Sequence, residues 1–298
     1  MPEGPAPHMT VRHAGRRLAV DVSGDPDGVP ILLMHGTPGS RTGPKPRSIV
    51  LYRMGIRLIT YDRPGYGGSD RHPKRRVIDA ADDVKAIADA LGVDRLAVVG
   101  RSGGGPHALA CAASEQLAGR ITKVGVLVTL APPDSAGLDW YGGMGASNLE
   151  EHSSDPAALS DALIERAERT RRDPQSLLDH LGPDLTPADR RVVDDVAIGA
   201  QIRASHAEGV RPGAYGWIDD DLAFRSHWGF DPASIRLPVR LWHGAKDAFS
   251  PVSHARWLAK QMPFAEAVVQ EDAGHFSAVE ILPTMLRWLA TAEPVEVC

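Results

Sequence analysis

The chain of 298 residues suits one α/β domain with an insertion, or two domains of ordinary size. Apolar residues make up 43% of the chain and charged residues 24%, which is typical of a globular protein and argues against disorder over most of its length. Because 38 acidic residues outnumber 33 basic ones, the net charge is −5, which disfavours a function in nucleic-acid binding.

Three short apolar runs in the first hundred residues each end in a glycine-rich turn. They cover residues 30–35, 56–61 and 96–99, and they are rich in Val, Ile and Leu without alternating polar positions. Continuous runs of this kind are typical of strands that are buried on both faces. The sequence therefore predicts three strands of a parallel sheet, with glycine concentrated where each strand ends.

Helical patterns separate these strands. Apolar residues recur at three- and four-residue spacing from Val77 to Leu91, and a second helix is predicted over 106–113, before a fourth strand at 124–130. The end of the chain repeats the alternation, with strands at 239–243 and 267–269 and helices at 251–261 and 277–290. Alternation of this kind predicts the α/β class, with a mostly parallel central sheet flanked by helices.

Residues 133–235 interrupt this alternation. Helices are predicted over 156–171 and 187–206, each preceded by a capping residue and opened by proline. We expect a helical cap inserted after the fourth parallel strand, on a core made of 1–132 and 236–298. The cap carries 19 acidic and 9 basic residues, so it is acidic while the core is mildly basic. Most of these acids are expected on solvated helix faces.

The third turn, residues 100–104 (GRSGG), has the G-x-S-x-G pattern of a nucleophile elbow between a buried strand and a helix. A serine on so sharp a turn needs glycine on either side, because side chains there would clash. The turn also aims backbone N–H groups at the serine oxygen. A glycine-rich turn can instead hold a nucleotide phosphate, but Pro106 removes one donor and no P-loop lysine is present.

A serine nucleophile needs a histidine base and an acid that orients it. His275 directly follows the last predicted strand, and Asp247 lies just past the strand before it. Parallel strands end at one edge of the sheet, so Ser102, Asp247 and His275 can meet there. Asp134, after the fourth strand, is an alternative acid. His35 is expected to be a structural hydrogen-bonding residue rather than a base.

Taken together, these motifs resemble the α/β-hydrolase fold family, in the branch with a serine nucleophile and a helical lid. The resemblance rests on the 35–39 (HGTPG), 62–69 (DRPGYGGS) and 100–104 turns, on the acid turn at Asp247 and on Gly274-His275. These parts cover about two-thirds of the chain. The resemblance implies an oxyanion hole made by the backbone N–H groups of Thr37 and Gly103, and it implies neither a metal nor a cofactor.

The preferred function is hydrolysis of a carboxylic ester of a small or medium apolar substrate, such as a methyl ester or a lactone, through an acyl-enzyme on Ser102. The alternative is an aminopeptidase of the proline-iminopeptidase type, in which Glu150 and Glu151 would hold an ammonium group. Against it, Gly103 stands where those relatives usually carry tryptophan. Cleavage of carbon–carbon bonds, cofactor-free haloperoxidase activity and a non-catalytic binding module remain open, whereas a serine elbow excludes the epoxide-hydrolase and dehalogenase chemistries.

Five residues are candidates for contact with the substrate. Arg101 is expected either to bind an anionic group or to form an ion pair away from the substrate. Aromatic residues of the cap are expected either to line an apolar pocket or only to attach the cap to the sheet. Among the histidines, His254 is expected on a helix surface. The candidates for substrate contact are Arg101, Trp140, Tyr141, Trp217 and Phe276.

Two cysteines cannot build a disulfide framework, and Cys111 lies in an apolar run where a buried thiol is expected. The first residues contain no apolar stretch of signal-peptide length, and no run is long enough to cross a membrane. We therefore expect a cytoplasmic protein, monomeric or homodimeric, whose partner is a small-molecule substrate rather than a nucleic acid or a membrane.

Overall fold

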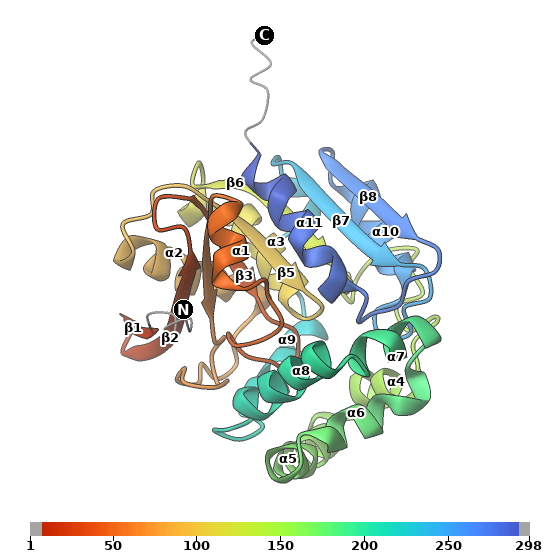
Figure 1. Ribbon diagram of the computed structural model, residues 1–298. Helices are drawn as coiled ribbons and strands as arrows, with labels where there is room; N and C mark the ends of the chain where they lie inside the picture. Colours follow the sequence, from red (N-terminus) through yellow and green to blue (C-terminus); the bar gives the residue numbers. More distant parts are fainter. Residues whose placement is uncertain (1–7, 292–298) are drawn as a thin grey trace.

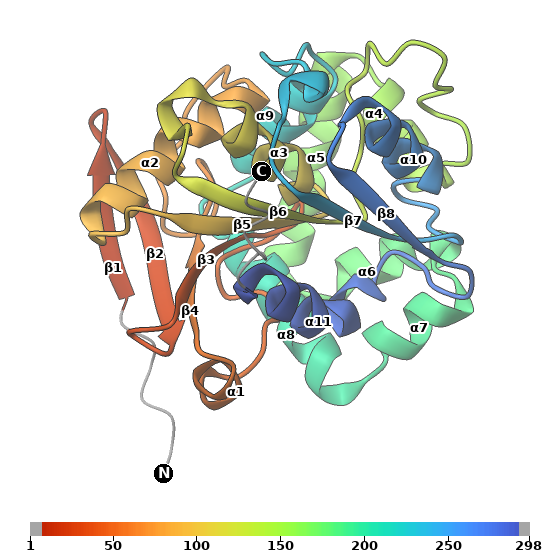
Figure 2. The ribbon, with the colours of Figure 1, turned by 90° about the horizontal axis from the view of Figure 1, so that it is seen from above.

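The computed structural model describes residues 8–291. Eight strands form one sheet in the order β1-β2-β4-β3-β5-β6-β7-β8. Figure 2 shows the sheet from above, with helices on either side of it. Strand β2 is antiparallel to both of its neighbours, and the pairs from β4 to β8 are parallel. The strands are β1 (His8–His13), β2 (Arg16–Gly24), β3 (Val29–Met34), β4 (Ile56–Tyr61), β5 (Leu96–Arg101), β6 (Ile121–Leu127), β7 (Val239–Gly244) and β8 (Ala265–Gln270).

Helices cover both faces of this sheet. Figure 2 shows α2, α3 and α10 on one face and α1 and α11 on the other. Each face has its own apolar core, because the parallel strands carry Val, Ile and Leu on both sides. The helices that cover the sheet are α1 (Ser48–Arg53), α2 (Ala80–Ala90), α3 (Gly104–Ala113), α10 (Val252–Gln261) and α11 (Ala278–Ala290). The predicted α/β sandwich is confirmed, and Cys111 is fully buried in α3.

Two details differ from the prediction. The fourth predicted strand ends at Leu127 instead of Leu130, because Val128 turns into the left-handed region with φ 50°. The β1–β2 hairpin was not predicted, because polar and charged residues interrupt both strands and leave no continuous apolar run. It pairs with β4 at the edge of the sheet and so extends the parallel strands with an antiparallel ribbon.

Between β6 and β7 the structure has helices and no strand, and Figure 1 shows α4–α8 grouped together below the sheet. The predicted helix over 187–206 is two helices, because Asp195 leaves the helical conformation and accepts hydrogen bonds from the amides of Ala197 and Ile198. The helices of this segment are α4 (Ala146–Ser153), α5 (Pro156–Arg172), α6 (Gln175–Leu181), α7 (Pro187–Val193), α8 (Val196–Gly209) and α9 (Tyr215–Phe224). From residue 8 to residue 291, no helix is long and apolar enough to cross a lipid bilayer.

Candidate active site

Ser102 sits on a strained turn between β5 and α3. Its φ is 53°, in the left-handed region that a non-glycine residue rarely adopts. A Cβ on Gly100 would lie 2.1 Å from the Gly104 carbonyl oxygen, and one on Gly104 would lie 2.4 Å from the Met34 carbonyl oxygen. Glycine is therefore required at both flanks, which is the steric reason expected from the G-x-S-x-G pattern.

A chain of hydrogen bonds joins Ser102 to His275 and Asp247. The Ser102 Oγ lies 3.0 Å from His275 Nε2, and His275 Nδ1 lies 2.8 Å from Asp247 Oδ2. The backbone N–H groups of Phe249 and Ser250 donate to the other oxygen of Asp247 at 2.8 and 2.9 Å. The structure thus brings together three residues that are 28 and 145 positions apart in the chain, in an arrangement suited to activating the serine oxygen.

The carboxylate of Asp247 is held in its charged form. Burial alone would raise its pKa, but the charge of His275 and the hydrogen bonds from His243 and His275 act more strongly and bring the pKa well below its usual range. An acid that stays ionised fixes the proton of His275 on Nδ1, so that Nε2 faces Ser102 as an acceptor. The ring of Phe249 packs 5.2 Å from that of His275 and shields this pair.

The loop that carries His275 is also tied to the helical segment between β6 and β7. Asp189, buried at the start of α7, accepts a hydrogen bond of 2.7 Å from the backbone N–H of Phe276. The same carboxylate approaches Gly274 so closely that a Cβ there would lie 2.3 Å from it. Gly274 is therefore needed for the close approach of Asp189.

The turn after β3 lies beside the elbow. A Cβ on Gly103 would lie 2.2 Å from Thr37 Oγ1, so the two segments are in direct contact. Thr37, Gly103 and Ser102 all line the same cavity. Within residues 8–291, the backbone N–H groups of Thr37 and Gly103 donate no hydrogen bond to the protein. Both donors are thus free to meet a ligand oxygen near Ser102.

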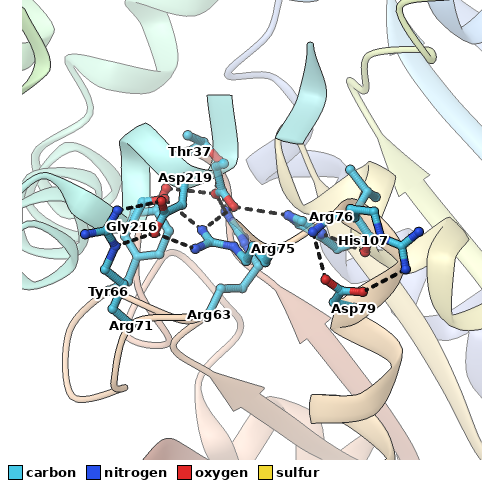
Figure 3. A network of polar contacts seen from close by, with 12 residues as sticks. Thr37, Arg63, Tyr66, Arg71, Arg75, Arg76, Asp79, His107, Gly216 and Asp219 are labelled. Atoms are coloured by element: carbon cyan, nitrogen blue, oxygen red, sulfur yellow. Dashed lines mark hydrogen bonds and ion pairs between the residues drawn. The ribbon is translucent and has the colours of Figure 1, made fainter. Parts of the chain in front are cut away.

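The side chain of Thr37 is held by a buried ion network that centres on Asp220 of α9. Figure 3 shows its other members, with Thr37, Arg63 and Arg75 labelled. Thr37 Oγ1 donates to Asp220 Oδ2 at 2.8 Å and accepts a hydrogen bond of 2.8 Å from Arg63. Arg63 also donates to Asp220 Oδ2, and so does Tyr66. Arg75 donates to the other oxygen at 2.7 Å. A carboxylate from α9 therefore positions the turn that carries the Thr37 amide.

Asp220 remains charged in this network. Its side chain is fully buried, which by itself would raise its pKa, but the nearby charges of Arg63 and Arg75 and a hydrogen bond with His107 lower the pKa well below its usual range. His35 supports the same turn, since its Nε2 accepts a hydrogen bond from the Arg63 backbone N–H. The expectation of a structural role for His35 agrees with this geometry.

A cavity of about 120 Å³ lies between Ser102 and the helices of residues 146–224. Much of its wall is apolar, and polar side chains reach it from β5 and from α4, α5, α6, α8 and α9. The apolar lining residues include Leu130, Leu177, Leu181, Ile202, Trp217, Phe224, Phe249, Phe276 and Val279. The polar ones include Arg101, Glu151, His152, Arg166, His180, His206 and Asp221. A cavity of this size accepts a group comparable to benzene, which an engineered cavity of about 150 Å³ can bind.

A family model of the α/β hydrolase fold matches residues 29–280 of the chain. The chain belongs to the α/β-hydrolase fold family. It is 30% identical, over 230 residues, to pimeloyl-[acyl-carrier protein] methyl ester esterase of Aromatoleum aromaticum, a match covering 74% of this chain and 81% of that protein. It is 26% identical to proline iminopeptidase of Neisseria gonorrhoeae, over 85% and 84% of the two chains. A malate-bound thermophilic esterase from Thermogutta terrifontis superposes with a TM-score of 0.68 at 24% identity, over 96% of this chain and all of that one.

Three of the five residues predicted to contact substrate line the cavity of this α/β hydrolase: Arg101, Trp217 and Phe276. Trp140 and Tyr141 do not line this cavity. Trp140 is buried behind the cavity wall, where its Nε1 donates to the Ala131 carbonyl and its ring packs against histidines. Tyr141 is exposed on the outside. Both lie on a loop before α4, whose path the sequence pattern did not reveal.

Glu151 reaches the cavity, whereas Glu150 is exposed to solvent. Both carboxylate oxygens of Glu151 already accept hydrogen bonds from other side chains of the protein. Trp217 Nε1 donates to one at 2.7 Å, and Arg166 donates to the other at 3.0 Å. Burial and the charge of Asp221 raise the pKa of Glu151. A carboxylate that is paired in this way is poorly suited to binding a substrate ammonium group.

The positions of Asp134 and His254 both differ from what a role at the site or on the surface requires. Asp134 is exposed, while Asp247 is the carboxylate hydrogen-bonded to His275, so the alternative acid is not at the site. The prediction that His254 lies on a helix surface is wrong. His254 is fully buried, where its Nδ1 accepts from the Ala131 N–H and its Nε2 donates to the Trp140 carbonyl. Helix α10 packs on the sheet through the face that carries this histidine.

Proposed function

We propose that this α/β hydrolase is a serine hydrolase that cleaves a carboxylic ester through an acyl-enzyme on Ser102. The observation that carries the proposal is the chain of hydrogen bonds from Ser102 through His275 to the buried Asp247, at the edge of a cavity. The turn at Ser102 and the two free amides beside it support the same chemistry.

In the proposed reaction, His275 takes the proton of Ser102 while Oγ forms a bond to the ester carbonyl carbon. The N–H groups of Thr37 and Gly103 stabilise the oxyanion, with each donor contributing about 3 kcal/mol to transition-state stabilisation. The carbon–oxygen bond to the alcohol then breaks, and His275 gives its proton to the leaving alcohol. Water, deprotonated by His275, attacks the acyl-enzyme. The bond to Oγ then breaks as His275 returns the proton to Ser102, and the acid is released.

An ester is preferred to an amide as the substrate. The named esterase relative acts on a methyl ester, and the mostly apolar cavity of about 120 Å³ suits a small acyl group and a small alcohol. A methyl ester and a lactone are the forms that fit best. The second candidate is an aminopeptidase like the proline iminopeptidase relatives. Both carboxylates that line the cavity, Glu151 and Asp221, are already paired with other side chains, which weighs against it because neither is left to hold an ammonium group.

The experiment compares p-nitrophenyl acyl esters with proline p-nitroanilide, together with labelling by a fluorophosphonate probe. We expect hydrolysis of the esters, no release from the anilide, and covalent labelling at Ser102 that is lost in Ser102→Ala. Labelling that persists in Ser102→Ala would refute the nucleophile. Faster cleavage of the anilide than of the esters would favour the aminopeptidase, and an absence of both turnover and labelling would favour a binding module.

A further inference from the structure

Arg101 is the last residue of β5 and directly precedes Ser102. Its side chain is half-buried and lines the cavity. A guanidinium group has five N–H donors. Across residues 8–291, the one acceptor these donors reach is the Pro44 carbonyl, at a long 3.4 Å. Most of the hydrogen-bonding capacity of Arg101 is therefore unused inside the protein.

No carboxylate offsets the charge of Arg101. Burial alone acts on its pKa, which falls to about 10, so the side chain is still charged at neutral pH. The expectation of an ion pair is not met, since the ion pairs found among residues 8–291 do not include it. A half-buried cation in a cavity that has no counterion among residues 8–291 is a candidate site for an anionic ligand, which would supply the missing charge.

The other charges around the cavity are compensated. Arg166 pairs with Glu151 at 3.0 Å, and Asp221 pairs with both His152 and Arg225. These groups already satisfy one another, so they offer little to an added ion. Arg101 thus leaves an uncompensated positive charge in the cavity that Ser102 also lines.

The wall next to Arg101 has an unused polar atom of its own. His206 of α8 lines the same cavity, and its Nδ1 is buried without a hydrogen-bond partner in the described chain. Burial, and then the charge of Arg101, lower the pKa of His206 to about 4. His206 is therefore neutral at pH 7 and can donate to or accept from a ligand without adding a second charge.

We propose that Arg101 binds a carboxylate of the substrate, so that the ester cleaved at Ser102 carries a free carboxylate group. The inference rests on the proposed function and narrows its substrate. One guanidinium matches one carboxylate in charge and in its two-pronged geometry, whereas a phosphate dianion would bring a second charge. Because Arg101 and Ser102 line the same cavity of about 120 Å³, a short carbon chain can join the carboxylate to the scissile carbonyl.

The substrate class that follows is a monoester of a short dicarboxylic acid, or an ester whose alcohol half carries the carboxylate. The apolar residues of the cavity would hold the carbon chain between the two polar ends. Arg101 would bind the carboxylate in the same way in both kinds of ester, and the experiment distinguishes between the two.

The first experiment compares mono-p-nitrophenyl glutarate with p-nitrophenyl pentanoate, which has the same chain length and no carboxylate. Because a hydrogen bond to a charged group is worth about 1.5–3 kcal/mol, we expect kcat/KM to favour the glutarate about 10- to 150-fold. Arg101→Met should abolish that ratio, and Arg101→Lys should restore part of it. In the alcohol half, 4-acetoxybenzoate is compared with its methyl ester.

A matched control is Arg203→Met, which removes a positive charge from α8 where Arg203 contacts Gln175 outside the cavity. The ratio should remain that of the wild type, which separates binding by Arg101 from a general effect of charge. A wild-type ratio near one for both pairs of esters, or a ratio that Arg101→Met leaves unchanged, would overturn the inference while ester hydrolysis itself stands.

A second experiment needs no turnover. Monomethyl glutarate should raise the melting temperature of Ser102→Ala and leave that of Ser102→Ala/Arg101→Met unchanged. If no ester is hydrolysed but this stabilisation depends on Arg101, the proposed function fails and the carboxylate site stands. Arg101→Met without ligand should melt no lower than the wild type, because the removed charge is half-buried and takes part in no ion pair within residues 8–291. A lower melting temperature would instead indicate that Arg101 is structural, and would overturn the inference.

Discussion

The network around Asp220 allows a quantitative prediction for the variant Asp220→Asn. The substitution keeps the size of the side chain but removes the negative charge that faces Arg63 and Arg75. The amide also replaces one acceptor oxygen with a donor. Arg75 retains Asp219 as a partner at 3.3 Å, whereas Arg63 has no second carboxylate in the described part of the chain.

The magnitude follows from the burial of both partners. The side chains of Arg63 and Asp220 are 1% and 0% exposed, so the variant leaves a desolvated charge without its counterion. Breaking a buried ion pair from one side costs about 3–5 kcal/mol. With an unfolding entropy of about 2.1 cal/mol/K per residue, the 298-residue chain should melt about 5–8 °C lower.

The assay is thermal and urea unfolding of both proteins at pH 7, together with kcat on a p-nitrophenyl ester. Because Asp220 also holds Thr37, kcat should fall more than KM rises. Asp89→Asn is the control, since it removes the same charge from an exposed carboxylate paired with Lys85 and Arg120, and its midpoint should stay close to that of the wild type. A melting temperature of Asp220→Asn within about 1 °C of the wild type would refute the reasoning.

The difference in stability between the wild type and Asp220→Asn should depend on pH in a defined direction. The pKa of Asp220 in the folded protein lies well below that of an unfolded aspartate, near 3.8. Its contribution to stability is therefore complete above about pH 4 and is lost as the pH falls below that value towards the folded pKa. The gap between the wild type and Asp220→Asn should stay constant from pH 8 to pH 5 and narrow only in stronger acid.

Two further predictions concern the hydrogen bonds of single residues. Asp247→Asn should lower kcat about 10⁴-fold on p-nitrophenyl esters, because the amide no longer fixes the tautomer of His275; a loss below tenfold would contradict the role of Asp247. For His254, burial lowers the pKa to about 4, and its Nδ1 must accept the Ala131 N–H, so only the neutral form fits. The unfolded state takes up this proton near pH 6.5, so the stability that depends on His254 falls as the pH drops from about 6.5 to 4. Urea midpoints at pH 7, 5.5 and 4.5 should decline less steeply in His254→Asn, and equal slopes would contradict this account.

The sequence was sufficient for the parts that depend on local pattern. Continuous apolar runs marked the parallel strands, and glycines at positions 100 and 104 marked a turn that no larger residue can make. Since parallel strands share one edge, the order of Ser102, Asp247 and His275 was enough to predict that they meet. These inferences hold because strand direction and steric exclusion act over a few residues and leave few alternatives.

Tertiary structure alone decided which side chains face the cavity. Trp140 and Trp217 are both tryptophans of the segment between β6 and β7. Trp140 lies behind the cavity wall and Trp217 lines the cavity, because the packing of that segment decides where each side chain points. The missing counterion of Arg101 and the five hydrogen bonds that converge on Asp220 arise from groups far apart in the chain. Pairing of charges depends on distance and burial in space, which no spacing along the sequence encodes.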